Sequence, residues 1–373
     1  MKRILSVAIV ATLLAASCSK TDVINPVGNQ IGFTTKMAKL TKASGDAADA
    51  DSTGLANLQA QDFRIWAYAD YDDPYTSASE LDQIYDQMAN LNVAYNKTDN
   101  TWAPAIDYYW PGKNKALRFF AVSGEGTHTV AVAINRKTTG EGESAVTTVA
   151  PTVTVSEYVV NHASPNTDLM VADFVHQKQD DEVNGEKGKV ALNFHHALTK
   201  VQFLFKTNTQ AADGNVYVQS VSVEGLNTKS TLVVDGEGET LADKFVWGER
   251  LVPATFNDDY TLAGDGFPTS LLHIGEAEAR TPTDNTAMLL DGDAEPFCTW
   301  LALPQNVEAK KVKIIYVIGN RQFERSFELS KGDLKNWGVN QYVRYTVTLT
   351  PNKVSFDSSV DDWSTTDVAE KEL

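Results

Sequence analysis

Alternation of apolar and polar residues with a period of two constrains the fold of this chain most strongly. The stretch KKVKIIYVIGNRQFERSFELS is typical of a β-hairpin, because apolar residues alternate with more polar ones and Gly319-Asn320 suits a two-residue turn. Similar alternation recurs at Val201, Phe203 and Phe205, and at Val343, Tyr345, Val347 and Leu349. Many short strands with polar turns predict an all-β fold of β-sandwiches, and two in tandem suit 373 residues.

The first strand is expected at about residues 29–36. In NQIGFTTK, Ile31 and Phe33 alternate with small or polar residues, as a half-buried strand requires. The following stretch, 37–61, contains KASGDAADADSTG, whose small and polar residues cannot form a packed core. We therefore predict a flexible loop there.

A boundary between two domains is expected near residue 185. The stretch HQKQDDEVNGEKGK is charged and contains two glycines, as linkers between domains often are. The predicted domains are 18–185 and 186–373, preceded by a leader at 1–17. One short helix is expected in the first domain, at residues 77–91, because apolar residues recur there at helical spacing.

The leader resembles a bacterial lipoprotein signal peptide. A positive start, Met1-Lys2-Arg3, precedes an apolar run from Ile4 to Ala16 that is too short to span a bilayer. Small residues then precede Cys18, as in the lipobox, where the peptide is cut before a cysteine that becomes acylated. The alternative is an ordinary cleavage site before a cysteine. A multiply acylated Cys18 would hold the protein on a membrane, and Ser19-Lys20-Thr21-Asp22 resembles the short signals that send some such lipoproteins to the cell surface.

Composition excludes some partners. A net charge of −17 argues against nucleic acid, because an acidic surface repels phosphate groups. The only cysteine besides Cys18 is Cys298, in the apolar run PFCTWLALP, where a buried free thiol is the expected state. We therefore expect no disulfide within the chain.

The sequence favours neither an enzyme nor a cofactor site. It has no GxSxG, HExxH, Walker A or CxxC motif. His195 and His196 are adjacent, so on a strand they point to opposite faces, and we expect one inward and one outward. The acidic loop DGDAEP is interpreted as solvated rather than as a calcium site. Trp66, Trp110 and Trp300 lie in strand patterns and are expected to pack inside.

Several stretches together resemble the fimbrillin family, the type V pilins and pilus-associated lipoproteins of anaerobic Gram-negative bacteria. In chain order they are the lipoprotein cysteine, IGFTT, FRIWAYAD, YYWPGKNKALRFFAVSG, DLMVA, VALNFHHALTKVQFLFKT, NWGVNQYVRYTVTL and VSFDSSVDDW. Each is a plain β pattern, but their order and spacing cover nearly the whole chain after Cys18.

This resemblance implies two transthyretin-like β-sandwich domains and a mode of assembly. The subunit would reach the surface as a lipoprotein, and a trypsin-like protease would remove the leader with the first strand. The emptied groove would then accept a strand from another pilus subunit. The partners implied are other subunits, the outer membrane through Cys18, and a surface receptor that the sequence does not identify.

The chain departs from the family pattern at the processing site. Several family members are cut after arginine. The segment between Thr35 and Phe63 has no arginine, and its basic residues are Lys36, Lys39 and Lys42. Either a lysine is used, or the subunit keeps its lipid and acts as an anchor, so stalk, tip and anchor roles all stay open. The alternative function is a surface lipoprotein that binds glycans through exposed aromatic residues.

Overall fold

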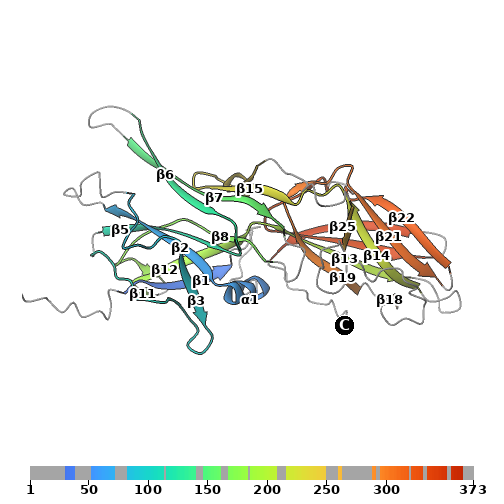
Figure 1. The fold of residues 1–373 in the computed structure, drawn as a ribbon, viewed down its shortest axis with the longest axis horizontal. Coiled ribbons are helices and arrows are strands. Elements are labelled where there is room, and N and C mark those ends of the chain that lie inside the picture. The colour runs from blue at the N-terminus through green and yellow to red at the C-terminus, as the bar shows by residue number, and fades with distance from the viewer. Residues whose placement is uncertain are drawn as a thin grey trace, which may run out of the picture.

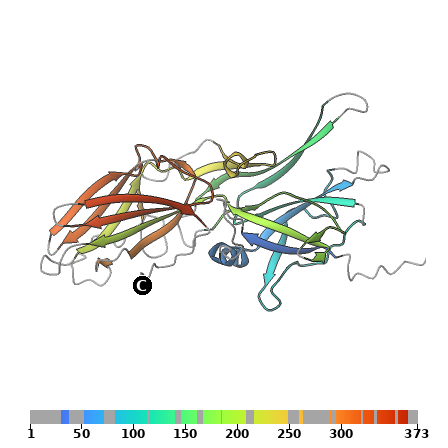
Figure 2. The ribbon, with the colours of Figure 1, turned by 180° about the vertical axis from the view of Figure 1, so that it is seen from behind.

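A computed structural model shows the architecture of the chain (Figure 1). It describes residues 30–37, 52–71, 82–112, 115–139, 146–160, 167–183, 185–207, 216–248, 259–262, 288–290, 295–318, 321–330, 334–350 and 354–363. These residues form an elongated molecule that is built almost entirely of strands, seen from two sides in Figures 1 and 2. The expected all-β class is confirmed, whereas the transthyretin-like layout stays a prediction.

The first half of the molecule is organised around an eight-stranded sheet. Its strand order is β2-β3-β4-β1-β12-β8-β5-β9, and β5 also pairs with β2, so the path from β2 to β5 closes into a ring. The strands are β1 (Gly32–Met37), β2 (Phe63–Tyr71), β3 (Leu91–Asn96), β4 (Thr101–Pro104), β5 (Lys115–Ser123), β8 (Met170–Ala172), β9 (Val175–Lys178) and β12 (Lys189–His196).

A second sheet covers the outer face of this ring. It has the order β16-β15-β7-β6, formed by β16 (Phe245–Trp247), β15 (Lys229–Asp235), β7 (Val146–Val159) and β6 (Val130–Thr139). Trp66 and Phe120, on β2 and β5, share a core with Val153 of β7 and Leu232 of β15. The short helix α2 (Leu241–Lys244) precedes β16 and has a capping box at Thr240.

The second half is a sandwich of two sheets around one apolar core. One sheet has the order β19-β13-β24-β25, and the other has β17-β14-β21-β22 with β18 also on β14. Their bounds are β13 (Thr199–Thr207), β14 (Val216–Glu224), β17 (Asp259–Leu262), β18 (Met288–Leu290), β19 (Glu295–Ala302), β21 (Lys311–Ile318), β22 (Arg321–Glu328), β24 (Gln341–Leu349) and β25 (Val354–Asp362). Two small two-stranded sheets complete the structure: β10 (Glu182–Val183) with β11 (Glu186–Lys187), and β20 (Gln305–Asn306) with β23 (Asn336–Trp337).

The predicted strand faces of the second half are confirmed. The expected inward residues are all buried: Val201, Phe203, Phe205, Val312, Ile314, Tyr316, Ile318, Val343, Tyr345, Val347 and Leu349. The predicted hairpin is present as β21 and β22, which pair in antiparallel register from Lys311↔Glu328 to Ile318↔Arg321. Period-two alternation predicts the inward residues of these strands correctly because each strand has one face on the core.

The helix predicted at 77–91 is wrong in its described part. Residues 82–90 form turns and an isolated bridge between Tyr68 and Ile84, and Leu91 begins β3. Left-handed backbone at Asp82, Asp86, Gln87 and Asn90 interrupts any helix there. Residues 77–81 lie outside the described residues.

The first half instead contains α1 (Ser52–Gln61), within the segment predicted to be a flexible loop over 37–61. Leu58 on this helix is fully buried. The loop prediction rested on the composition of the whole segment, which concealed the apolar residues Leu55 and Leu58, spaced three apart, at its end. The described part of 37–61 is therefore corrected from loop to helix over 52–61.

The boundary expected between residues 185 and 186 does not separate the sheets. Strand β12 follows it and pairs with β1 and β8 of the first half. Strands β15 and β16 lie later still, yet they belong to the sheet that covers the ring. The charged stretch that suggested a linker begins in β9 of the ring, passes through the small β10–β11 hairpin and ends at the first residue of β12.

Candidate functional site

Strand β1 lies between β4 and β12 in the ring. It runs parallel to β12 from Gly32↔Lys189 to Met37↔Phe194, and it meets β4 in antiparallel orientation at Phe33↔Trp102. We call the space between β4 and β12 that β1 fills the acceptor groove. A parallel pair of this kind joins segments far apart in sequence, so local pattern alone could not predict it.

The inward side of β1 is apolar and buried. Ile31, just before the strand, and Phe33 are 2% and 4% exposed, as their alternation predicts, and Met37 is 5% exposed. The Phe33 ring meets Phe63 and Phe119 edge-to-face, at centroid distances of 6.1 and 6.4 Å. Burying three such side chains stabilises the fold by roughly 5–9 kcal/mol. Met37 was missed because the predicted strand stopped at residue 36, although the period of two reaches it.

Hydrogen bonds hold the N-terminal end of β1. The Ile31 amide donates to the Tyr108 carbonyl at 2.8 Å, and the Gly32 amide donates to the Gly188 carbonyl at 3.0 Å. The Gln30 side chain donates to Asp107 at 2.7 Å. This end of β1 is therefore fastened by backbone groups of two loops that lie outside the ring strands.

The helix α1 contacts β1 and lies near the C-terminal end of that strand (Figures 1 and 2). Leu58 belongs to the same apolar cluster as Phe33 and Met37. The polar side chains of α1 bind elsewhere, because the Asp168 amide donates to Gln61 Oε1 at 3.0 Å and Asn57 Nδ2 donates to the Asp168 carboxylate at 3.4 Å. The helix is thus anchored without polar contacts to β1 among the hydrogen bonds described.

Of the predicted processing residues, the structure places only Lys36. It is an exposed residue of β1, and its Cα pairs with that of Asn193 on β12. Lys39, Lys42 and the predicted lipid-attachment residue Cys18 lie outside the described residues. Ile31 and Phe33 are brought together in one core, as expected for a first strand.

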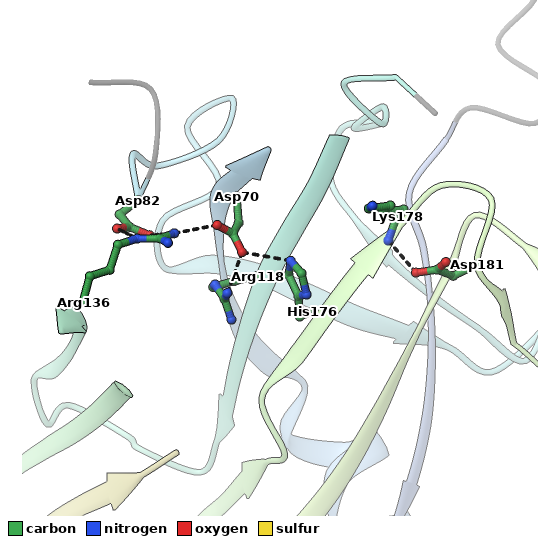
Figure 3. A network of polar contacts seen from close by, with 7 residues as sticks. All are labelled: Asp70, Asp82, Arg118, Arg136, His176, Lys178 and Asp181. Atoms are coloured by element: carbon green, nitrogen blue, oxygen red, sulfur yellow. Dashed lines mark hydrogen bonds and ion pairs between the residues drawn. The ribbon is translucent and has the colours of Figure 1, made fainter. Parts of the chain in front are cut away.

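Charged residues of the first half pair with one another. Asp70 of β2 contacts Arg118 of β5 and Arg136 of β6 at 2.5 Å each, and His176 of β9 at 2.9 Å, while Arg136 also binds Asp82 (Figure 3). Burial raises the pKa of Asp70, but hydrogen bonds from His176 and Arg136 and the charges of both arginines outweigh it and hold that pKa well below its usual range. The network ties β6 to the ring.

The adjacent histidines point to opposite faces, as predicted, but neither faces solvent. His196 lies 2.8 Å from Asp168, and both side chains are 1% exposed. His195 lies 3.0 Å from Asp173, and its side chain is 12% exposed because it packs against Phe245 of β16. The outward position expected for one histidine is therefore wrong, since a second sheet covers the outer face of β12.

The described residues contain no group of three or more metal-ligating side chains. No helix in the same part of the chain is long and apolar enough to cross a membrane. Trp66, Trp110 and Trp300 are buried, as predicted, and Tyr109 is the one aromatic residue exposed among those described.

The chain matches a family model and is similar to solved structures. The model of the family described as fimbrillin-like matches residues 41–363. A crystal structure of a fimbrial protein from Bacteroides vulgatus has 17% identity and a TM-score of 0.51, covering 90% of this chain and 99% of its own. The tip fimbrial protein Mfa3 from Porphyromonas gingivalis, with a C-terminal truncation, has 9% identity and a TM-score of 0.33, covering 83% and 96% respectively. No curated protein sequence matches the chain.

Proposed function

Because the chain belongs to the fimbrillin-like family, we propose that it is a structural and adhesive subunit of a fimbrium, not an enzyme, and that it joins other subunits by strand exchange. In this proposal a protease removes β1, and a strand from another subunit fills the acceptor groove. The observation that carries the proposal is the burial of Phe33 and Met37 on β1, and of Ile31 just before it, in a segment that precedes Lys39 and Lys42 in sequence.

Loss of β1 would create a strong template for another strand. The backbone groups of β12 that face β1 would lose their partners, and the apolar surface around Phe63 and Phe119 would be open to water. An incoming strand with apolar residues at alternate positions would restore both the ladder and the core. Ordering that strand offsets part of the roughly 5–9 kcal/mol gained by burial.

The position of Lys36 within β1 favours cleavage at a lysine later in the sequence. A protease needs its substrate extended and free of a β-ladder, and Lys36 is paired within β1. Cutting after Lys39 or Lys42 would also leave the whole of β1 on the released fragment. Lys39 and Lys42 are therefore the preferred processing residues in this proposal.

Export as a lipoprotein completes the proposal. Acyl chains on Cys18 would hold the subunit at the outer membrane, exposed at the cell surface, until the fragment that carries both Cys18 and β1 is removed. A subunit that escapes cleavage would stay anchored at the base of the fimbrium. The sequence motif before Cys18 supports this step.

Limited trypsin treatment of the folded protein tests strand exchange. We expect the first cut at Lys39 or Lys42 and no early cut in the cut-resistant variant Lys39→Gln/Lys42→Gln. The nicked protein should polymerise, or bind a fluorescent peptide of residues 29–37, as measured by size-exclusion chromatography and fluorescence anisotropy. The uncut protein should do neither.

Matched peptides show whether binding uses the buried side of β1. A Phe33→Asp peptide should bind at least 100-fold more weakly than the native peptide, whereas a Lys36→Ala peptide should bind about as well, because Lys36 is exposed. A nicked protein that stays monomeric and ignores the native peptide would show that β1 is not a placeholder. Glycan binding would then become the better account.

A further inference from the structure

Helix α1 follows the proposed cut sites, so it stays with the subunit when β1 leaves. We propose that α1 forms one wall of the acceptor groove and that its Leu58 contacts the residue of the incoming strand that takes the place of Met37. This inference rests on the proposed strand exchange and identifies a residue that selects the incoming strand.

The hydrogen bonds described for α1 and the residue after it join them to segments other than β1. Gln61 and Asn57 bind the segment at Asp168, whose own carboxylate lies against His196 at the end of β12. Asp62 directly follows the last residue of α1, and its carboxylate accepts a hydrogen bond from the Tyr95 amide at 3.2 Å. Its backbone carbonyl accepts a second hydrogen bond from the Ser123 hydroxyl at 2.5 Å. Each of these partners belongs to the part of the chain that remains after cleavage.

The apolar side of α1, by contrast, faces the groove. Leu58 is 0% exposed and shares its cluster with Ile31, Phe33 and Met37. Figures 1 and 2 place the helix beside the C-terminal end of β1, where Met37 lies, while Ile31 is at the opposite end. Leu58 should therefore interact with the residue at the Met37 position and not with the residue at the Ile31 position.

This arrangement restricts which strands can enter. The incoming strand needs an apolar side chain where Met37 lies, at the end next to α1, in addition to apolar residues at the Ile31 and Phe33 positions. Because a shift by one residue turns every side chain to the other face, contact with α1 also selects the register. The partner is thus a strand with apolar residues at positions one, three and seven.

A double-mutant cycle on the full chain, nicked by trypsin and freed of the fragment that carries β1, tests the contact. The protein variants are wild type, Leu58→Ala and the control Leu232→Ala, which removes an equally buried leucine from the core outside the ring. The fluorescent probes are the peptide of residues 29–37 and its Met37→Ala and Ile31→Ala forms. Affinity is measured by anisotropy.

We expect Leu58→Ala to lower the affinity for the native peptide by about 10–100-fold. The same change should lower the affinity for the Met37→Ala peptide by less than about threefold. Leu58→Ala should lower the affinity for the Ile31→Ala peptide by the same factor as for the native peptide. The control Leu232→Ala should change the affinity for every peptide by less than about threefold. Equal effects of Leu58→Ala and Leu232→Ala, or equal coupling to both peptide positions, would overturn the inference.

Hydrogen exchange gives a second test on the wild-type protein, which does not depend on how variants fold. Amides 56–61 should stay protected after nicking and removal of the fragment, because the polar anchors of α1 persist. Loss of protection at these amides would refute the claim that α1 stays folded beside the acceptor groove after β1 leaves. A nicked wild-type protein that keeps α1 protected but binds no peptide would instead refute strand exchange itself, and the wall with it.

Discussion

The indole of Trp363 stacks on the imidazole of His196 with a centroid distance of 3.9 Å and an interplanar angle of 4°. Trp363 directly follows β25 of the second half, whereas His196 ends β12 of the first half. The Trp363 amide also donates to the Asn340 carbonyl at 3.4 Å, and Asn340 in turn donates to the Leu198 carbonyl at 3.1 Å. The end of the last strand is thus packed into a core of the first half.

Truncating this tryptophan should destabilise the whole molecule. Trp363 is 2% exposed, so we expect Trp363→Ala to lower the free energy of unfolding by about 3–5 kcal/mol through the cavity it leaves. The control Val360→Ala, at a residue 44% exposed on β25, should cost less than about 0.5 kcal/mol. Urea denaturation followed by tryptophan fluorescence and circular dichroism measures both. Equal losses in the two variants would contradict the packing described.

Phe203 should be as important within the second half. Its ring is fully buried and stacks on Tyr345 at a centroid distance of 5.0 Å. We expect Phe203→Ala to lower the free energy of unfolding by about 3–5 kcal/mol. A loss below about 1 kcal/mol in denaturant melts would mean that the faces of β13 are reversed.

Acid should weaken the first half through Asp173. Burial raises the pKa of this carboxyl, but the hydrogen bond and charge of His195, the hydrogen bond of Asn193 and the charge of Lys244 outweigh it and lower the pKa from 3.8 to about 2. A lowered pKa contributes stability that is complete above the unfolded value of 3.8 and is lost as pH falls toward about 2.

The variant Asp173→Asn should therefore be less stable than the wild type at pH 5, and the difference should shrink between pH 4 and pH 2. Urea melts at several pH values measure this difference. A gap that stays constant over this range would show that the ionised carboxylate of Asp173 contributes nothing to stability.

The lipid anchor has its own test. Metabolic labelling with a fatty-acid analogue should mark the protein in native cells, and Cys18→Ser should abolish the label because the acylated thiol is gone. Cys298→Ser serves as the matched control and should keep the label. Labelling that persists in Cys18→Ser would refute the lipoprotein prediction.

Sequence reasoning was most successful where one physical rule acts locally. A strand with one buried face must alternate, so the inward positions of β13, β21 and β24 could be read directly, and so could Ile31 and Phe33. The same reasoning failed at residues 82–90, where helical spacing of apolar side chains occurs on a backbone with left-handed turns. Side-chain spacing does not report backbone handedness.

The sequence by itself determined the strand class, the faces of the clearest strands and the family, because each depends on patterns carried by neighbouring residues. Only the tertiary structure decided that β1 lies parallel to β12, that the ring closes between β2 and β5, and that α1 and Met37 share a core with Phe33. It also decided that His195 is covered and that Trp363 reaches the first half. These features join segments far apart along the chain, and the free energy that selects them comes from burial and backbone pairing between segments, which no local pattern encodes.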